Sequence, residues 1–349
     1  MTLEPDHAAT AQVPASTLPA PAAAPQRAVV FAYHTVGVRC LKVLLARGVD
    51  VALVVTHEDN PAETIWFESV AALCAEHGIA TITPADPHVA ELRERMVAAR
   101  PEWIFSFYYR HMLPQDLLAL APRGAYNMHG SLLPRYRGRV PVNWAVLHGE
   151  TETGATLHRM VAKADAGAIV AQTSIPILPD DTAFEVFGKL AVVAEKTLWD
   201  VLPAMLAGAV PSLPNDVALG SYFGGRTPAD GRIDWQQPAV AIYNLHRAVA
   251  PPYPGAWTQL AGRHLVIGRA RLAQLPATPA RHSAGGQADS QGSMEAARKA
   301  DLPAGLHVVD NRMFGIGGDG QAIEIQTLLA DGQPLAAAEL AALLRAADN

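Results

Sequence analysis

Residues 29–56 of the chain read VVFAYHTVGVRCLKVLLARGVDVALVVT, and this stretch decides the fold class. Two apolar runs, at 29–33 and 51–56, have the length of buried strands, and the stretch between them, 38–46, has the apolar spacing of a helix. Strands that alternate with helices in this way predict an α/β fold with a doubly wound, Rossmann-like parallel sheet. The same alternation predicts a helix over 62–77 and a buried strand over 103–107.

A second informative stretch is 127–138, NMHGSLLPRYRG. Asn127 and His129 are two residues apart, so in an extended segment their side chains lie on one face of the backbone. Downstream, 164–167 reads Ala-Asp-Ala-Gly and supplies a carboxylate at Asp165. An amide donor, an imidazole and a carboxylate are the groups needed to polarise a carbonyl, stabilise an oxyanion and move a proton. A lone Asn-x-His is a weak functional signal and more often caps a turn, and an Asp before Gly167 can also cap one, but together these residues indicate an active site.

Composition narrows the class of protein. The 349 residues, half of them hydrophobic, suffice for two domains. With 33 acidic and 27 basic residues, the chain lacks the excess of positive charge that binds nucleic acid, so no nucleic acid is expected as a partner. Cys40 and Cys74 stand in apolar, helix-like contexts and indicate buried thiols in a reducing, cytoplasmic compartment. The N-terminus lacks a continuous apolar segment, so neither a secretory signal nor membrane insertion is expected.

Two cofactor classes are disfavoured by spacing. Gly315-Ile-Gly-Gly-Asp-Gly320 has the glycine pattern of a dinucleotide loop, but the strand-like run 322–328 follows it, so no helix is available to bind a pyrophosphate. A hairpin turn is the better interpretation, and no NAD is expected. The 13 histidines form no His-Glu-x-x-His motif and the cysteines no Cys-x-x-Cys motif, so no metal is expected.

Composition also divides the chain into segments. Residues 1–27, rich in Ala and Pro without periodicity, are predicted to be a disordered tail. The catalytic domain is expected over 28–210, a Pro/Gly-rich linker over 211–232, and a smaller β-rich domain over 233–349. Within the last domain, the aperiodic stretch 276–303 is predicted to be a flexible insertion. Further predicted elements are strands at 155–160, 169–177, 265–267, 306–309 and 322–328 and helices at 183–206 and 239–250.

The stretch 127–138 resembles the signature of the 10-formyltetrahydrofolate-dependent formyltransferases. One branch is most similar, the N-terminal half of the bifunctional polymyxin-resistance enzyme ArnA, which formylates UDP-4-amino-4-deoxy-L-arabinose; it is here expected to be freestanding. The resemblance implies formyl transfer from 10-formyltetrahydrofolate, the cosubstrate, to the 4-amino group of such a nucleotide-linked sugar, in lipid A modification. It also implies a barrel-like C-terminal module. It is close over roughly 28–257, and the similar stretches include 29–34, 56–61, 105–113 and 154–160.

The resemblance assigns roles to particular residues. Asn127 and His129 would donate hydrogen bonds to the formyl oxygen, and Asp165 would orient His129 and raise the pKa of its imidazole. Arg139 would contact the folate, while Arg135 and Arg137 remain unassigned. The other folate contacts that it implies are His111, Met112, Leu113, Val161, Ala162, Lys163, Ala164 and Asp165.

Two other functions stay open. A methionyl-tRNA formyltransferase has the same fold and cosubstrate, but nine Lys/Arg against ten Asp/Glu from residue 234 onward make a poor surface for a polyanion. A non-catalytic binding module of the same fold is the second alternative, and the intact Asn127, His129 and Asp165 argue against it. The sugar, the nucleotide base and the oligomeric state stay open as well. Candidate sugar contacts, from position alone, are Tyr109, Arg226 and Tyr253.

Overall fold

The computed structural model describes residues 26–61, 63–276 and 302–347. Seven strands form the main sheet of the N-terminal domain, in the order β3-β2-β1-β4-β5-β7-β8. The first five are parallel, whereas β7 and β8 run antiparallel to their neighbours. The predicted doubly wound sheet is therefore confirmed, with two antiparallel strands added at one edge. The strands are β1 (Arg27–Ala32), β2 (Asp50–Val55), β3 (Thr81–Ile82), β4 (Trp103–Phe107), β5 (Ala125–His129), β7 (Glu152–Arg159) and β8 (Ile169–Pro176).

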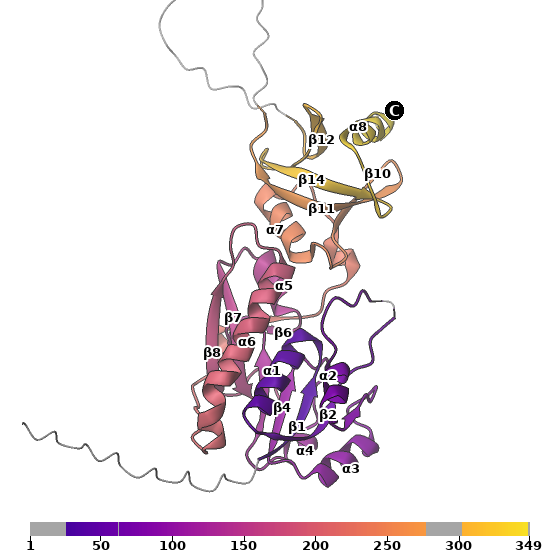
Figure 1. The fold of residues 1–349 in the computed structure, drawn as a ribbon. Coiled ribbons are helices and arrows are strands. Elements are labelled where there is room, and N and C mark those ends of the chain that lie inside the picture. The colour runs from indigo at the N-terminus through magenta and orange to yellow at the C-terminus, as the bar shows by residue number, and fades with distance from the viewer. Residues whose placement is uncertain (1–25, 62, 277–301, 348–349) are drawn as a thin grey trace, which may run out of the picture.

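Helices cover both faces of this sheet (Figure 1). On one face α1 and α6 pack together and bury Leu44 and Leu198, and on the other α3 and α4 bury Leu92 and Leu117 against β1. The order of winding reverses between β1 and β4. At such a reversal the carboxyl ends of the strands leave a crevice, where open α/β sheets place their ligand sites. The helices are α1 (His34–Ala46), α2 (Val70–Glu76), α3 (Ala90–Ala99), α4 (Gln115–Leu118), α5 (Pro141–Leu147) and α6 (Ala183–Leu206).

One predicted helix is shorter than expected. The apolar spacing predicted it over 62–77, but α2 begins only at Val70. The preceding residues run as a loop over the start of α1, because the rings of Trp66 and Phe67 pack on the ring of His34, with centroids 4.6 and 3.9 Å away. Tertiary packing of these aromatic side chains therefore overrides the local helical pattern.

The C-terminal domain is a curled antiparallel sheet that forms a half-barrel (Figure 1). The predicted β-rich, barrel-like module is therefore confirmed. Its strands lie in the order β10-β11-β14-β13-β12, with β15 paired to β14, and α7 packs on β11 and β14. The glycine-rich stretch 315–320 makes the hairpin turn between β13 and β14, as predicted, and the N–H of Gly317 donates to the carbonyl of Gln321. The elements are α7 (Ala239–Val249), β10 (Ala256–Leu260), β11 (Arg263–Ala273), β12 (Gly305–Val309), β13 (Arg312–Ile316), β14 (Ala322–Ala330), β15 (Gln333–Pro334) and α8 (Ala337–Ala347).

Several predicted boundaries shift in the structure. Arg27 belongs to β1 and pairs with Asp50 of β2, so it is not part of a tail. Residues 1–25 and 277–301, which hold most of the predicted tail and insertion, lie outside the described residues. Part of the predicted linker is built into the N-terminal domain, because its short strand β9 pairs with β6 after the turn of the 127–138 stretch. Its elements and their partner are β6 (Arg137–Gly138), η1 (Val217–Leu219), β9 (Tyr222–Phe223) and η2 (Pro228–Gly231).

Polar contacts join the two domains where α5 meets α7. The Asn143 side chain on α5 donates to the carbonyl of Ala248 at 2.8 Å, and the Tyr243 hydroxyl on α7 donates to the carboxylate of Asp180 at 2.7 Å. The C-terminal domain is thereby held beside the carboxyl end of the parallel strands (Figure 1).

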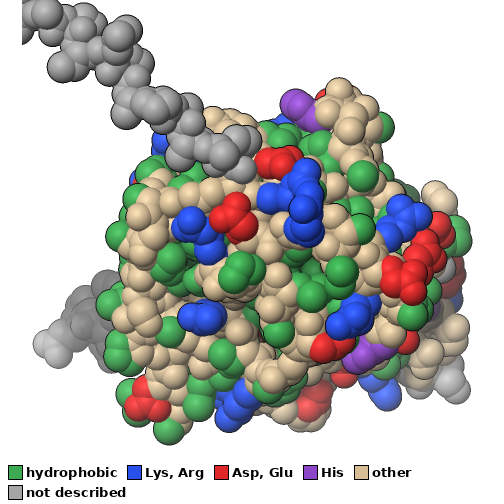
Figure 2. All heavy atoms as spheres, turned by 90° about the horizontal axis from the view of Figure 1, so that it is seen from below, with side chains coloured by type: hydrophobic (Ala, Val, Ile, Leu, Met, Phe, Trp, Pro, Cys, Tyr) green, Lys and Arg blue, Asp and Glu red, His purple; other side chains and the backbone are tan. Residues whose placement is uncertain are grey.

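The thiols and the outer surface are as the sequence composition predicts. Cys40 and Cys74 are buried free thiols, as predicted. The face turned away from the C-terminal domain carries acidic and basic side chains intermixed with hydrophobic ones (Figure 2). In the described part of the chain, each helix is too short or too polar to cross a membrane.

Candidate active site

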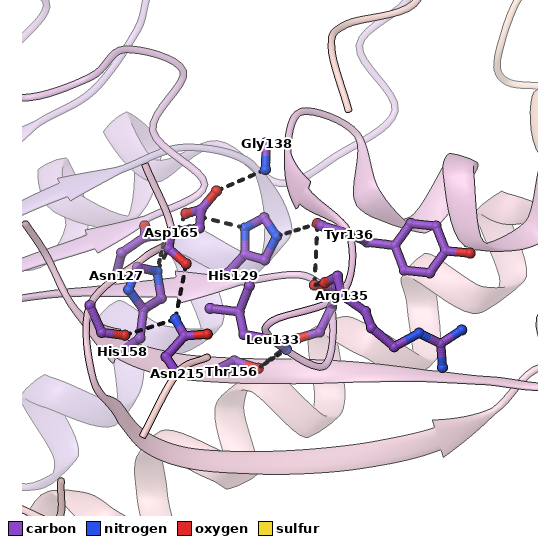
Figure 3. Close-up of polar contacts among 12 residues, drawn as sticks. Asn127, His129, Leu133, Arg135, Tyr136, Gly138, Thr156, His158, Asp165 and Asn215 are labelled. Carbon is purple, nitrogen blue, oxygen red and sulfur yellow. Dashed lines mark hydrogen bonds and ion pairs between the residues drawn. The ribbon is translucent and has the colours of Figure 1, made fainter. Parts of the chain in front are cut away.

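Asn127 and His129 lie at the carboxyl end of β5, which is fixed between β4 and β7 (Figure 3). The chain then turns at Ser131, whose carbonyl accepts a hydrogen bond from the Thr156 hydroxyl at 2.6 Å. This turn brings Tyr136 back over β5, where its carbonyl oxygen lies 2.8 Å from Nε2 of His129. The glycine-serine turn of the sequence motif thus closes over the buried imidazole.

Asp165 reaches the same point from the loop between β7 and β8 (Figure 3). Its Oδ1 lies 3.6 Å from Nδ1 of His129 and 3.4 Å from Nε2 of His158, and its Oδ2 accepts the N–H of Gly138 at 2.9 Å. The residue has a φ of 49°, in the left-handed region that Asp tolerates better than most residues. The structure therefore brings together the three residues that the sequence pattern singled out, Asn127, His129 and Asp165.

Burial and neighbouring charges shift the pKa values of Asp165 and His129 in opposite directions. Burial raises the pKa of the Asp165 carboxyl, but the positive charges of His129 and His158 when they are protonated, together with the N–H of Gly138, outweigh burial and hold that pKa well below its usual range. Burial lowers the pKa of His129, and the charge of Asp165 opposes this only in part. The expectation that Asp165 raises the pKa of His129 thus has the right sign, but burial is the larger influence. We expect an ionised Asp165 beside a neutral His129 near neutral pH.

The contacts also locate the proton of the neutral imidazole. A carbonyl oxygen only accepts hydrogen bonds, so the contact with Tyr136 assigns the proton of His129 to Nε2. Nδ1 then faces Asp165 with its lone pair. A proton taken up at Nδ1 would stand between the ring and the carboxylate, where Coulomb attraction stabilises it. This geometry fits a base at Nδ1 whose cation is stabilised by Asp165.

His158 belongs to this cluster and was missed from the sequence. Its Nδ1 lies 2.9 Å from the carbonyl oxygen of Arg159, which assigns the proton to Nδ1 and leaves Nε2 to accept a hydrogen bond from Nδ2 of Asn127 at 3.1 Å. That bond orients the Asn127 amide and leaves one of its N–H groups to donate elsewhere. The antiparallel register of β5 and β7 places His158 opposite Asn127, a pairing that the local sequence pattern does not contain.

Asn215 is a second residue that was missed, because its segment was interpreted as a linker. Its Nδ2 donates to the carbonyls of Asp165 at 3.0 Å and Gly167 at 2.9 Å. Its Oδ1 is buried without a partner among the described residues, and an unpaired buried acceptor costs about 1–3 kcal/mol. The side chain is therefore placed for its two donations, which hold the turn that aims the Asp165 carboxylate.

Replacing Asn215 by Asp tests this role. The substitution keeps the size of the side chain but removes both donors and turns a carboxylate toward two carbonyl oxygens. We expect turnover to fall at least about tenfold, because a loss of about 1.4 kcal/mol in the positioning of Asp165 is one power of ten in rate. Asp216→Asn is the matched control, since its oxygen still accepts the N–H of Ala218. Equal turnover in the two variants would show that the Asn215 contacts are not needed.

Apart from Arg139, the residues that the resemblance assigns to folate lie on two loops beside Asn127, His129 and Asp165. The loop with residues 111–113 follows β4, and 161–164 directly precede Asp165. The loops meet through Leu113 and Met160, which share one apolar cluster. Met112 and Val161, next to these two residues, are 56% and 40% exposed although both are large and hydrophobic. The two loops therefore leave apolar surface uncovered beside the polar group of Asn127, His129 and Asp165.

A loop formed by residues 57–69, of which residue 62 is not described, closes the same end of the sheet. The ring of His57 stacks on Tyr109 with centroids 4.2 Å apart, and its Nε2 accepts the N–H of Arg110 at 3.0 Å. Arg110 forms a bidentate ion pair with Glu63 at 2.8 and 2.9 Å. Tyr109, a candidate sugar contact from its position, is thus packed beneath this loop.

The arginines of the motif have contacts with residues outside the cluster. Arg139 is exposed, and its side chain passes Gly225 of the connector. Arg135 pairs with Glu150, and the buried Arg137 donates to the carbonyl of Val217 at 3.5 Å. Arg226 and Tyr253, the other two candidate sugar contacts, line a pocket at the domain junction. In the described residues no three His, Cys, Asp or Glu side chains are grouped as metal ligands.

Comparison with solved structures finds the same fold in sugar-modifying enzymes. WlaRD, a sugar 3N-formyl transferase crystallised with dTDP and 5-N-formyl-THF, has 17% identity, covers 90% of this chain and 99% of its own, and gives a TM-score of 0.64. The N-formyltransferase of Helicobacter canadensis, in complex with folinic acid and dTDP-3-aminofucose, has 17% identity, covers 87% and 99%, and gives 0.62. A sugar N-formyltransferase of Shewanella sp. FDAARGOS_354 has 19% identity, covers 72% and 99%, and gives 0.57.

Family models identify both domains. Residues 29–202 match the formyl transferase model, and residues 226–345 match the model of the formyl transferase C-terminal domain. The first match contains the whole cluster around Asp165 except Asn215, which lies between the two matches. With both domains matched over most of its length, the chain belongs to the formyl transferase family.

Proposed function

We propose that the chain transfers the formyl group of 10-formyltetrahydrofolate to the 4-amino group of a nucleotide-linked sugar. The observation that carries this proposal is the grouping of Asn127, His129 and Asp165 at the carboxyl end of β5. An amide donor, a neutral imidazole and an ionised carboxylate are the groups that attack of an amine on a formyl carbon requires. Enzymes of this fold were crystallised with folates and with dTDP or a dTDP-amino sugar, which supports this choice of reactants.

The proposed reaction forms one C–N bond and breaks another. The neutral amine attacks the formyl carbon, and the formyl oxygen becomes anionic. The free N–H of Asn127 donates to this oxygen, and such a donor typically lowers the barrier by about 3 kcal/mol. His129 takes the proton of the amine at Nδ1, beside Asp165. When the bond from the carbon to N10 breaks, His129 returns the proton to N10 and is neutral again.

The resemblance implies that Asn127 and His129 both donate to the formyl oxygen, and this assignment instead gives them different roles. The Nε2–H of His129 is already bonded to the carbonyl of Tyr136, so Asn127 is the side-chain donor that remains for the formyl oxygen. His158 supports that role because it fixes which end of the Asn127 amide faces the cluster.

The two loops beside the cluster support the folate part of the proposal. Met112 and Val161 are exposed apolar side chains next to the shared cluster of Leu113 and Met160. A flat ring that covered them would gain roughly 25 cal/mol for each Å² of apolar surface removed from water. We assign the pterin ring to this place, with His111 and residues 161–164 around it.

For the acceptor we propose UDP-4-amino-4-deoxy-L-arabinose, which would place the chain in lipid A modification and polymyxin resistance, in the cytoplasm. The stretches 29–34, 56–61, 105–113 and 154–160 support this finer assignment by their similarity to the branch that formylates this sugar. A tRNA acceptor is less well supported, because residues from 234 onward carry a net charge of −1 and the face seen in Figure 2 mixes both signs. A passive binding module would have no use for an ionised carboxylate kept buried at a cost of several kcal/mol.

A panel of acceptors tests the proposal. Purified protein is expected to consume 10-formyltetrahydrofolate with UDP-linked 4-amino-4-deoxy-L-arabinose and to yield the N-formyl sugar, identified by mass spectrometry. The panel includes 3-amino and 4-amino sugars linked to UDP or dTDP, and initiator Met-tRNA. Consumption with the tRNA alone would refute the sugar acceptor. Folate binding without turnover on any acceptor would favour the non-catalytic module.

A further inference from the structure

The backbone carbonyl of Tyr136 decides which ring nitrogen of His129 carries the proton. It accepts the Nε2–H at 2.8 Å and so leaves Nδ1 with a lone pair that faces Asp165 (Figure 3). Tyr136 itself has a φ of 56°, in the left-handed region that bulky residues rarely adopt. Such a conformation persists only where the surrounding structure holds it. The turn over His129 must therefore be fixed by contacts from outside its own backbone.

Hydrogen bonds hold the peptide groups on both sides of Tyr136. In the first group, the carbonyl of Arg135 accepts the Ser131 hydroxyl at 2.6 Å. The N–H of Tyr136, at the other end of that group, donates to Oγ of Ser221 at 2.9 Å. In the second group, the N–H of Arg137 donates to the backbone carbonyl of Ser221 at 3.0 Å, opposite the carbonyl that accepts the imidazole proton. Ser221 therefore binds the N–H of both peptide groups.

Ser221 belongs to the connector, residues 211–232, which lies directly against this turn. A Cβ at Gly220 would lie 2.1 Å from the carbonyl oxygen of Pro134, so only a residue without a side chain permits this close approach. Asn215, earlier in the same connector, holds the loop that aims the catalytic carboxylate. One segment of chain therefore holds both the turn on the imidazole side and the loop on the carboxylate side.

The contact with the Ser221 hydroxyl has a consequence for the imidazole. Without this oxygen the N–H of Tyr136 loses its acceptor, and Tyr136 can return to a negative φ, which turns its carbonyl away from His129. With no acceptor left at Nε2, the imidazole proton is better placed at Nδ1, where Asp165 accepts it. A neutral ring in that state has no lone pair at Nδ1 and cannot take a proton there.

We propose that Ser221 is a positioning residue that sets the tautomer of His129 by fixing the Tyr136 carbonyl on its Nε2–H. The inference rests on the proposed function, because it takes Nδ1 of His129 as the atom that accepts the proton of the amine. Ser221 acts through two peptide groups in this arrangement and does not contact the reacting atoms.

The tautomer can be measured without turnover. In protein labelled with a heavy nitrogen isotope at its histidine rings, NMR separates a ring nitrogen that carries a proton from one that carries a lone pair. The signals of His129 are those missing from the spectrum of His129→Ala. In the wild type we expect the proton of the neutral ring at Nε2, and in Ser221→Ala a population with the proton at Nδ1. Ser221→Thr keeps the hydroxyl and should give the wild-type signals.

Steady-state kinetics gives the second measurement. Because kcat is proportional to the fraction of molecules in the competent tautomer, Ser221→Ala should lower kcat roughly tenfold and leave both KM values nearly unchanged. Ser221→Thr should recover most of the loss. Ser212→Ala is the matched control, since Ser212 is exposed in the same connector. Thermal unfolding of each variant checks that it is folded.

A second pair of variants tests the approach of the connector to the turn. Gly220→Ala pushes a methyl group against the carbonyl of Pro134 and should change the kcat and the His129 signals in the same direction as Ser221→Ala. Gly224→Ala, in the same connector, has open space around the added methyl group and should match the wild type.

A proton found at Nδ1 of neutral His129 in the wild type would overturn the inference. Equal signals and equal turnover in Ser221→Ala and Ser212→Ala would overturn it as well. The same holds for a fall in turnover with unchanged His129 signals, because Ser221 would then act on something other than the tautomer. A tautomer that depends on Ser221, in a protein that formylates no acceptor, would support the inference and overturn the proposed function instead.

Discussion

Replacing His129 by Ala or Asp165 by Asn is expected to lower turnover by roughly two or more orders of magnitude while folate binding persists. In the first variant no ring remains to take the proton of the amine. In the second, the amide keeps an acceptor for the N–H of Gly138 but no longer carries the charge that stabilises a proton at Nδ1 of His129. Steady-state turnover and a separate folate titration distinguish loss of chemistry from loss of binding.

The double variant should be little worse than the poorer single variant. His129 and Asp165 act on one proton in the proposed reaction, and residues that act as a unit give strongly non-additive losses. His88→Ala is a control of the same residue type, because His88 is exposed in the loop before α3. Losses that multiply in the double variant would mean that the two side chains work independently. Near-normal turnover in either single variant would move the catalytic assignment elsewhere.

The fold could be predicted from sequence wherever the local pattern and the burial agree. The bounds of β4, 103–107, match the prediction because all five side chains are buried and the apolar run is continuous. The bounds of α6, 183–206, match because a Thr182–Glu185 capping box marks its start. The antiparallel direction of β7 and β8 could not be predicted, since a strand pattern does not state which neighbour it pairs with.

The same distinction applies to the site. Asn127 and His129 could be identified because a spacing of two places both on one face of a strand end. His158 and Asn215 could not, because their contacts join residues 31 and 50 positions apart in the chain. The length of the loop before α2 escaped prediction for a related reason: its aromatic residues pack on His34 of another element. Pairings of this kind arise only when the sheet and the connector are assembled.

A second large effect is expected at Gly167, the last residue of the Ala-Asp-Ala-Gly motif. A Cβ at this position would lie 1.9 Å from the carbonyl oxygen of Arg159, at the end of β7. That strand is held by its ladder to β5 and β8, so the clash must displace the loop instead. The displacement would draw Asp165 away from His129 and break the bond from Asn215 to the carbonyl of Gly167.

Gly167→Ala should therefore reduce turnover about as much as Asp165→Asn, roughly two orders of magnitude, with a loss of unfolding free energy of about 1–3 kcal/mol, as overpacking typically costs. Gly188→Ala is the matched control: it lies inside α6 with open space around the added methyl group, and Ala favours a helix over Gly by about 1 kcal/mol. That control should keep full turnover and unfold at an equal or higher temperature. A folded Gly167→Ala protein with turnover close to that of Gly188→Ala would contradict the assignment, because Asp165 would then not need its observed position.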